Sequence, residues 1–258
     1  MHPIAFQAGP LTIHWYGVMM AIAFIAGLWT ASRRGLREGI AADKILDIGP
    51  WLVVGTILGA RTLYVVTYWK DSFAGGSWTE IFKIWNGGLV FYGGLIGASL
   101  AAILYARVKH IALWKLADVI APSIALGYVF GRIGCLLNGC CYGEACSLPW
   151  AIHYPPGHQT YPNGVHPTQI YDSLLNLILY LGLAWLYRHK KFDGQVFATY
   201  LLCYAVTRSI VESFRGDYPP THIHSALQLT PGQLVSIGIF VTGVVMWAIL
   251  QRFQPKRA

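Results

Sequence analysis

The chain has 258 residues, of which 55% are hydrophobic and only 12% are charged, about half of the roughly 25% charge of a typical soluble domain. So few polar side chains cannot cover a water-soluble fold, which excludes a soluble enzyme and favours a polytopic membrane protein. The net charge of +8 is compatible with a nucleic-acid partner, and the positions of the basic residues decide that question.

Seven apolar segments are predicted to cross the membrane as helices, because about 20 apolar residues span a bilayer. They cover residues 11–31, 45–68, 87–106, 114–130, 169–187, 196–211 and 233–250. The fourth is interrupted by Lys115, Asp118 and Pro122, and the sixth is short. The sequence therefore predicts an all-α fold that forms a single integral membrane domain over residues 1–258.

Basic residues gather on alternate connections between these spans. Most of the 19 follow the first, third, fifth and seventh spans, and the opposite loops hold only Lys70, Lys83 and Arg215. Cytoplasmic loops carry the excess of Lys and Arg. The N-terminus is therefore predicted outside and the C-terminus in the cytoplasm. The positive net charge is then explained by the orientation of the chain in the membrane and by contact with anionic membrane lipids. No nucleic-acid partner is expected.

Three arginines fall within or at the end of the predicted spans: Arg61, Arg132 and Arg208. An Arg within a span costs about 2.5–3.5 kcal/mol on insertion scales, so it indicates a partner, a pathway or a site. Two simpler alternatives remain open. Arg61 can snorkel to the interface, and Arg208 can pair with Glu212, four residues further along the same helical face. The predicted topology places all three arginines toward the outer leaflet.

Guanidinium groups that face one cavity repel each other unless an anion lies between them, and phosphate fits the Arg fork bidentately. A phospholipid headgroup is therefore the expected ligand. Other polar residues predicted at this depth are His14, Tyr16, Tyr92, His166, Gln169, Tyr171 and Asp172. An aromatic belt explains any single Tyr among them equally well.

The segment from Gly131 to Gly143 is rich in glycine and is predicted to be non-helical backbone that lines a cavity. Four cysteines lie in or beside it: Cys135, Cys140, Cys141 and Cys146. Adjacent Cys140 and Cys141 fit the spacing of a zinc site poorly, so no metal is expected. A disulfide, a nucleophile activated by Arg132 and simple packing residues remain open alternatives.

A series of motifs runs along nearly the whole chain. They are His14-Trp15-Tyr16-Gly17, Gly59-Ala60-Arg61 with Tyr64, Gly87-Gly88-Leu89-Val90-Phe91-Tyr92-Gly93-Gly94-Leu95-Ile96-Gly97, Ala117-Asp118-Val119-Ile120-Ala121-Pro122, Gly131-Arg132-Ile133-Gly134 to Gly143, His166-Pro167-Thr168-Gln169-Ile170-Tyr171, and Tyr204 to Arg208 with Ile210-Val211-Glu212. In this order they resemble the prolipoprotein diacylglyceryl transferase family of bacterial inner membranes.

The resemblance implies transfer of the diacylglyceryl group of phosphatidylglycerol to the lipobox cysteine of a prolipoprotein signal peptide. The reaction forms a thioether and releases glycerol phosphate, and no cofactor is expected. The resemblance makes Arg132 and Arg208 essential and adds Tyr16 and Asn138 to the site. The candidate catalytic residues are Arg132, Arg208, Tyr16, His14, Tyr92 and His166. The candidate residues for phosphatidylglycerol are Arg132, Arg208, Arg61, Asn138, Gly143, Tyr204 and Glu212.

The chain departs from the family pattern at three positions. Cys135 replaces an Asn, Cys140 replaces a Glu, and Tyr92 stands where many members have a His proposed as the base. We therefore expect the acceptor thiol to be activated by nearby guanidinium charge, with no single indispensable base. The alternative functions are a non-enzymatic pathway for lipids or anions and a membrane thiol oxidoreductase.

Overall fold

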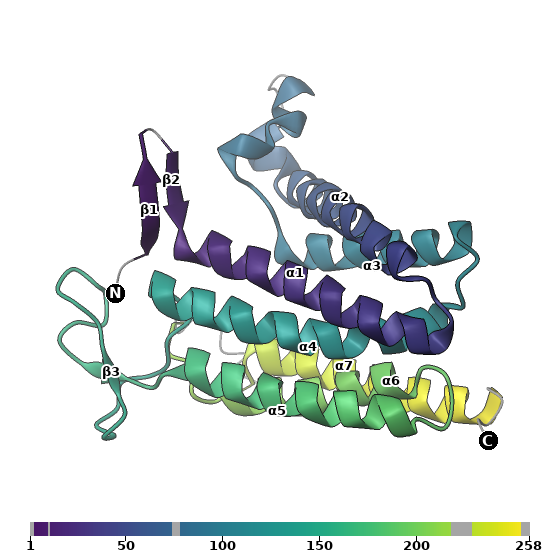
Figure 1. Cartoon of the computed structure of the whole chain (residues 1–258). Helices are drawn as coiled ribbons and strands as arrows, with labels where there is room; N and C mark the ends of the chain where they lie inside the picture. The colour runs from purple at the N-terminus through teal and green to yellow at the C-terminus, as the bar shows by residue number, and fades with distance from the viewer. Residues whose placement is uncertain (1–2, 10, 74–77, 218–228, 254–258) are drawn as a thin grey trace. The chain divides into compact units, whose positions relative to one another are not determined.

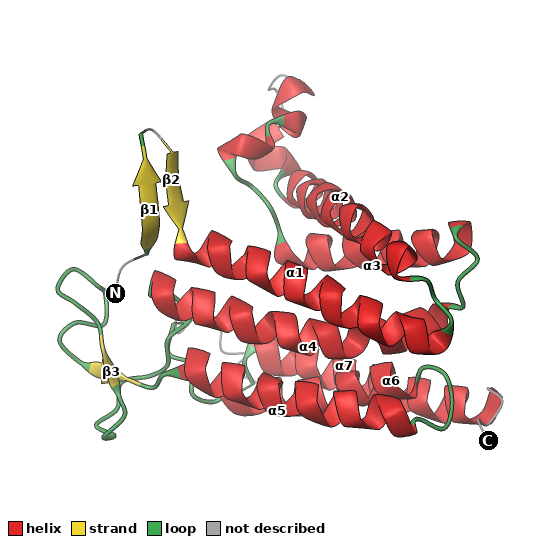
Figure 2. Cartoon of the chain, viewed as in Figure 1, coloured by secondary structure: helices red, strands yellow, loops and turns green. Residues whose placement is uncertain are grey.

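The computed structural model describes residues 3–9, 11–73, 78–217 and 229–253. Helices dominate this part of the chain (Figures 1 and 2). The long helices are α1 (Trp15–Gly35), α2 (Ala42–Thr67), α3 (Phe91–Val108), α4 (Leu113–Asn138), α5 (Thr168–His189), α6 (Gln195–Glu212) and α7 (Pro231–Phe253). Short helical turns cover Leu36–Glu38, Trp69–Phe73, Trp78–Phe82 and Ile84–Asn86. The prediction of a helical fold is thus confirmed.

Four short strands accompany the helices in the described ranges. β1 (Ile4–Ala8) and β2 (Leu11–His14) form an antiparallel hairpin, in which Phe6 is paired with Ile13. β3 (Ile152–His153) and β4 (Gly164–Val165) form a second antiparallel pair. The prediction that the first helix begins at Leu11 is therefore wrong. Residues 11–14 pair with β1 instead, and the helix begins at Trp15.

Six of the described helices are long and apolar enough to cross a membrane: α1, α2, α3, α4, α5 and α7. Many of their large apolar side chains are exposed, as Ile25, Val66 and Ile178 illustrate, each about two-thirds exposed. Such surfaces are typical of contact with lipid. Helix α6 carries Gln195, Arg208 and several hydroxyl residues, and it is not among the six. A multi-pass membrane protein follows, while the count of seven spans and their orientation stay predictions.

Helix α4 corrects the prediction for the glycine-rich segment. The helix continues through Gly131 and Gly134 to Asn138, and only the following residues leave it. A Cβ at Gly134 would lie 3.2 Å from the ring of Tyr16 in α1. Gly134 therefore permits close packing of α4 against α1 while the helix stays intact. The helix ends where Gly139 and Cys141 adopt left-handed conformations, with φ of 76° and 61°.

The chain divides into two compact units, residues 1–31 with 117–258 and residues 32–116. In the second unit, α2 and α3 pack through glycines. A Cβ at Gly55 would lie 2.7 Å from the carbonyl oxygen of Gly97, so larger residues cannot be accommodated there. Close packing of α2 against α3 therefore accounts for the glycine at position 97. The expectation of a single domain stays a prediction.

In the first unit, a buried ion pair links the first part of α4 to the connection between α5 and α6. Lys190 Nζ lies 2.8 Å from Asp118 Oδ2, and both side chains are almost completely buried. The same carboxylate accepts hydrogen bonds from the backbone N–H groups of Gly194 and Phe197 at the start of α6. Asp118 therefore orders the first turn of α6, the helix that carries Arg208.

Candidate functional site

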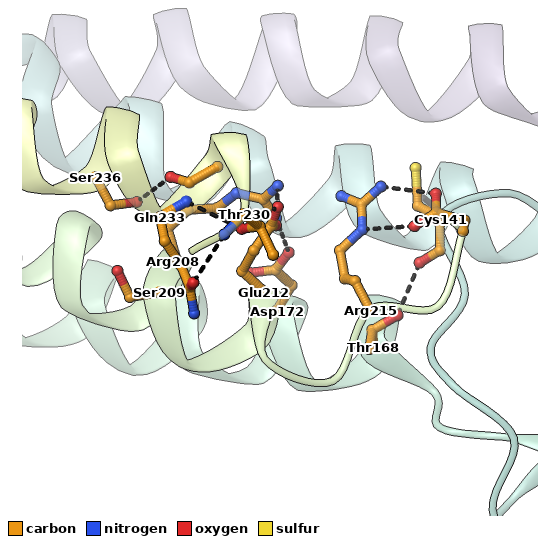
Figure 3. Close-up of polar contacts among 12 residues, drawn as sticks. Cys141, Thr168, Asp172, Arg208, Ser209, Glu212, Arg215, Thr230, Gln233 and Ser236 are labelled. Carbon is orange, nitrogen blue, oxygen red and sulfur yellow. Dashed lines mark hydrogen bonds and ion pairs between the residues drawn. The ribbon is translucent and has the colours of Figure 1, made fainter. Parts of the chain in front are cut away.

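A buried carboxylate lies between the two arginines that the sequence singled out. Arg132 Nε, from α4, lies 2.8 Å from Asp172 Oδ2 of α5. Arg208 Nη1, from α6, lies 3.8 Å from the same oxygen. Figure 3 shows Asp172 and Arg208 close to each other and to Glu212. Three helices thus bring two positive charges to one acidic side chain. Asp172 lies between the two guanidinium groups, in the position where the sequence predicted an external anion.

Arg208 has a second acidic partner on its own helix. Its Nη2 lies 2.5 Å from Glu212 Oε2, and the Glu212 side chain is completely buried. The predicted pairing of Arg208 with Glu212 is confirmed. Thr230 donates its hydroxyl to Glu212 Oε1, and Thr230 and Gln233 cap the first turn of α7 reciprocally (Figure 3). A Cβ at Gly232 would lie 2.5 Å from the Glu212 carboxyl carbon, so α7 approaches this carboxylate closely.

Arg132 is held by an aromatic side chain one helical turn earlier. Its Nη2 donates a 2.6 Å hydrogen bond to the hydroxyl of Tyr128, and its guanidinium lies 4.9 Å from the centre of the Tyr128 ring. The Tyr128 ring meets that of Tyr204 edge to face, and Tyr204 in turn stacks on Tyr200. Tyr204, a predicted lipid-binding residue, therefore contacts the site through Tyr128.

The charges of this cluster balance, since Arg132 and Arg208 face Asp172 and Glu212. The arrangement nevertheless keeps capacity for another anion. The Nη1 atom of Arg208 is buried and makes no hydrogen bond to any described residue, because Asp172 is too distant for one. A buried guanidinium donor without a partner is costly. A phosphate oxygen is an acceptor that would satisfy it.

Three thiols gather just beyond the end of α4. The Sγ atoms of Cys135, Cys140 and Cys141 all lie within 4.8 Å of one another. All five cysteines of the chain are free in this structure. The pKa of the Cys141 thiol is lowered, first by a hydrogen bond with Cys135 and then by one with Cys140. The positive charges of Arg215 and Arg132 lower this pKa further.

Gly143 and His166 belong to a wall of extended backbone beside the cluster. The Gly143 N–H donates to the carbonyl of His166, and Gly143 forms an antiparallel bridge with Arg215. A Cβ at Gly143 would lie 2.5 Å from the Phe214 carbonyl oxygen, so the position requires glycine. This wall and the start of α7 surround a cavity of about 540 Å³, which Glu212 also lines. The ring nitrogen Nδ1 of His166 lies 3.4 Å from the Tyr171 hydroxyl.

Arg61 lies in the unit formed by residues 32–116, and its guanidinium donates hydrogen bonds to main-chain oxygens. Its Nε donates to Ile81, its Nη1 to Gly87 and Gly88, and its Nη2 to Glu80, over distances of 2.6–3.1 Å. These contacts tie the loop before α3 to α2. They favour an architectural role for Arg61 over the predicted contact with lipid phosphate.

The remaining predicted residues are more exposed. His14 lies in β2, Tyr16 lies in the first turn of α1 beside Gly134, and Asn138 ends α4; each is exposed. Tyr92 lies in the unit formed by residues 32–116 and is half exposed. Tyr16 lies within electrostatic range of Arg132, and the Asn138 side chain forms a hydrogen bond with the Cys140 thiol.

Two contributors to the cluster were missed as site residues. Asp172 is an acidic residue inside a predicted span, which is a signal for function in its own right. Tyr128 precedes Arg132 by four positions, the spacing at which helical side chains meet.

The sequence model of one family, described as prolipoprotein diacylglyceryl transferase, matches residues 3–249. The chain belongs to the prolipoprotein diacylglyceryl transferase family. The resemblance stated from the motifs is thus confirmed, and Arg132, Asp172 and Arg208 lie within the part of the chain that matches the family.

Several relatives carry the name phosphatidylglycerol–prolipoprotein diacylglyceryl transferase. One from Bacillus velezensis is 36% identical over 252 residues, which cover 95% of this chain and 91% of the relative. One from Chromohalobacter salexigens is 34% identical and covers 98% of this chain and 93% of its own length. One from Clostridium tetani is also 34% identical, with coverage of 99% and 100%. This member of the diacylglyceryl transferase family therefore matches its relatives over nearly their full length.

Proposed function

We propose that this chain transfers the diacylglyceryl group of phosphatidylglycerol to the thiol of a lipobox cysteine in a prolipoprotein. The proposal rests on the family and on the names of its relatives. The observation that carries it is the meeting of Arg132 and Arg208 at Asp172, because a buried pair of guanidinium groups fits a lipid phosphate.

In this reaction the acceptor sulfur forms a bond to the glyceryl carbon that carries the phosphate ester. The carbon–oxygen bond to phosphate breaks, and glycerol phosphate leaves with the bonding electron pair. The phosphate group gains negative charge during this step. Arg132 and Arg208 face that charge from two helices, and donors fixed before the reaction stabilise it without reorganisation.

Asp172 and Glu212 hold the guanidinium groups in place before the lipid binds. Without them, two buried positive charges would repel each other. The unpaired Nη1 donor of Arg208 supplies a hydrogen bond to the incoming phosphate. The site thus exchanges part of an internal ion pair for a pair with the substrate.

The acceptor must react as a thiolate, because the thiol is a weak nucleophile. We infer that positive charge near the site lowers the pKa of the acceptor thiol, and that His14, Tyr92 and His166 are dispensable as bases. The proposal places the protein in the bacterial inner membrane, with seven spans, the N-terminus outside and the site toward the outer leaflet. The bias of Lys and Arg among the loops supports that orientation.

The decisive experiment incubates the purified protein with phosphatidylglycerol vesicles and a lipobox peptide, and detects the thioether product by mass spectrometry. A peptide with Ser in place of the acceptor Cys is the control. We expect product with the Cys peptide alone, and a loss of about 10²–10³ in rate for Arg132→Ala or Arg208→Ala. Lipid movement across the vesicle without product would support the anion pathway, and disulfide exchange without product would support the oxidoreductase.

A further inference from the structure

The three-thiol cluster has the dimensions of a metal site. The Sγ atoms of Cys135, Cys140 and Cys141 lie within 4.8 Å of one another, and each cysteine is partly accessible. In a tetrahedral zinc site with Zn–S bonds of about 2.3 Å, neighbouring sulfurs are about 3.8 Å apart. The sulfurs are therefore at most about 1 Å further apart than one bound ion requires.

The backbone holds these sulfurs together. The chain leaves α4 after Asn138 and turns back, so that the Cys140 N–H donates to the Cys135 carbonyl oxygen. Cys141 has a φ of 61°, a strained conformation for a residue other than glycine. Such strain persists where the surroundings fix it, and it is frequent at functional sites. This turn brings the side chain of Cys135 to the adjacent pair, which the linear spacing alone did not suggest.

Two buried side chains from the start of α5 fix the turn. Thr168 donates its hydroxyl to the Cys141 carbonyl oxygen at 2.7 Å (Figure 3). Gln169 donates its amide to the Cys140 carbonyl oxygen at 2.7 Å. Both donors are almost completely buried. Supporting hydrogen bonds of this kind orient the ligands of metal sites.

The charges around the cluster suit an anionic metal complex. Three thiolates and one divalent ion carry a net charge of −1. Arg215 and Arg132 both act electrostatically on the Cys141 sulfur. Arg215 is itself held in place by a bidentate pair with Asp217. Positive side chains therefore lie where a thiolate complex needs them.

We propose that Cys135, Cys140 and Cys141 bind one thiophilic ion of the zinc class through three thiolates. Among the described residues, no fourth Cys, His, Asp or Glu joins the group. Three protein ligands with an open fourth position are typical of catalytic zinc sites, whereas structural sites are closed by four. Copper(I) shares the preference for thiolates, so the experiment includes an arm for each ion.

The open position has a use that rests on the proposed function. A thiol that binds zinc gives up its proton to solvent and stays a thiolate. The acceptor cysteine of the prolipoprotein would bind there, beside Arg132, and attack the glyceryl carbon from that position. This arrangement supplies the thiolate without a dedicated base, in a chain that carries Tyr92 where many family members have His.

The first experiment measures bound metal by mass spectrometry in the purified full-length protein after expression with added zinc. We expect one ion per chain in the wild type and in Cys146→Ser and Cys203→Ser, whose thiols lie outside the cluster. The ion should be lost in Cys135→Ser and Cys141→Ser. Loading with Co²⁺ should give a thiolate charge-transfer band, and a parallel titration with Cu⁺ identifies the preferred ion.

Two results would overturn the metal site: a wild type that binds neither ion, or a disulfide among these cysteines in the protein isolated without reductant. The open position is tested by adding the lipobox peptide to the Co²⁺ form. We expect the spectrum to change with the Cys peptide and to stay unchanged with the Ser peptide. An unchanged spectrum with both peptides overturns the role of the open position. Because these readouts need no turnover, they stand apart from a failure of the transferase assay.

Discussion

Arg132 Nε and Asp172 Oδ2 form a buried ion pair of 2.8 Å between α4 and α5, and the same carboxylate faces Arg208 on α6. The positive charge that the sequence places in the membrane is therefore balanced within the chain before any lipid binds. Asp172 both positions the guanidinium groups and competes with a substrate phosphate for them.

Asp172→Asn keeps the shape of the side chain and removes its charge. Breaking a buried ion pair costs about 3–5 kcal/mol, because the guanidinium groups are left uncompensated. We expect a lower midpoint of thermal unfolding in detergent with zwitterionic lipid. Phosphatidylglycerol should restore more stability to the variant than it adds to the wild type, since its phosphate replaces the lost carboxylate. Equal effects of the two lipids on both proteins would contradict this role.

Tyr128→Phe removes one hydroxyl and keeps the ring that lies against Arg132. The lost hydrogen bond leaves a buried charged donor unsatisfied, which costs about 1–3 kcal/mol. We expect kcat/KM for phosphatidylglycerol to fall by about tenfold, with the fold retained. Tyr142→Phe is the control, because Tyr142 packs against Tyr154 and His158 and makes no contact with Arg132. A fall of the same size in both variants would contradict the assigned role.

Gly232→Ala tests the approach of α7 to Glu212. The new Cβ would overlap the carboxylate and displace it from Arg208. Overpacking of this kind costs about 1–3 kcal/mol, and the thermal midpoint and the transferase rate should both fall. Gly238→Ala is the matched control in the same helix, since no atom lies within 4 Å of its added Cβ. A normal rate in Gly232→Ala would show that the Arg208–Glu212 pair is unimportant.

Arg61→Lys separates an architectural role from a catalytic one. Lysine cannot reproduce the four hydrogen bonds to main-chain oxygens. Each bond to a charged group contributes about 1.5–3 kcal/mol. We expect reduced yield and thermal stability, with an unchanged KM for phosphatidylglycerol in the molecules that fold. A raised KM at normal stability would instead support the predicted contact with lipid.

His166→Ala and Tyr92→Phe test whether a single base is needed. The acceptor thiol has an ordinary pKa of about 8.5, and nearby positive charge lowers it. We expect each variant to keep measurable turnover and normal binding of phosphatidylglycerol. If each change abolished turnover while lipid binding stayed intact, activation by charge alone would be wrong.

The sequence predicted most of the helices because long apolar segments have few other structures available to them. It also singled out Arg132 and Arg208, since charge inside a span is costly enough to stand out. It missed the start of α1 by several residues, because a segment as short as Leu11–His14 does not distinguish a strand from the beginning of a helix. It also broke α4 too early, because glycine weakens a helix in general but permits close packing against α1 here.

The sequence by itself determined that this chain is helical, lives in a membrane, places most of its positive charge on alternate loops and belongs to the diacylglyceryl transferase family. Only the tertiary structure decided which charges meet. Asp172 and Arg132 are distant in sequence, and no local pattern pairs α4 with α5. The same holds for the thiols, because the turn after Asn138 brings Cys135 to Cys140 and Cys141. Packing between helices sets these distances, so they cannot be predicted from helical periodicity alone.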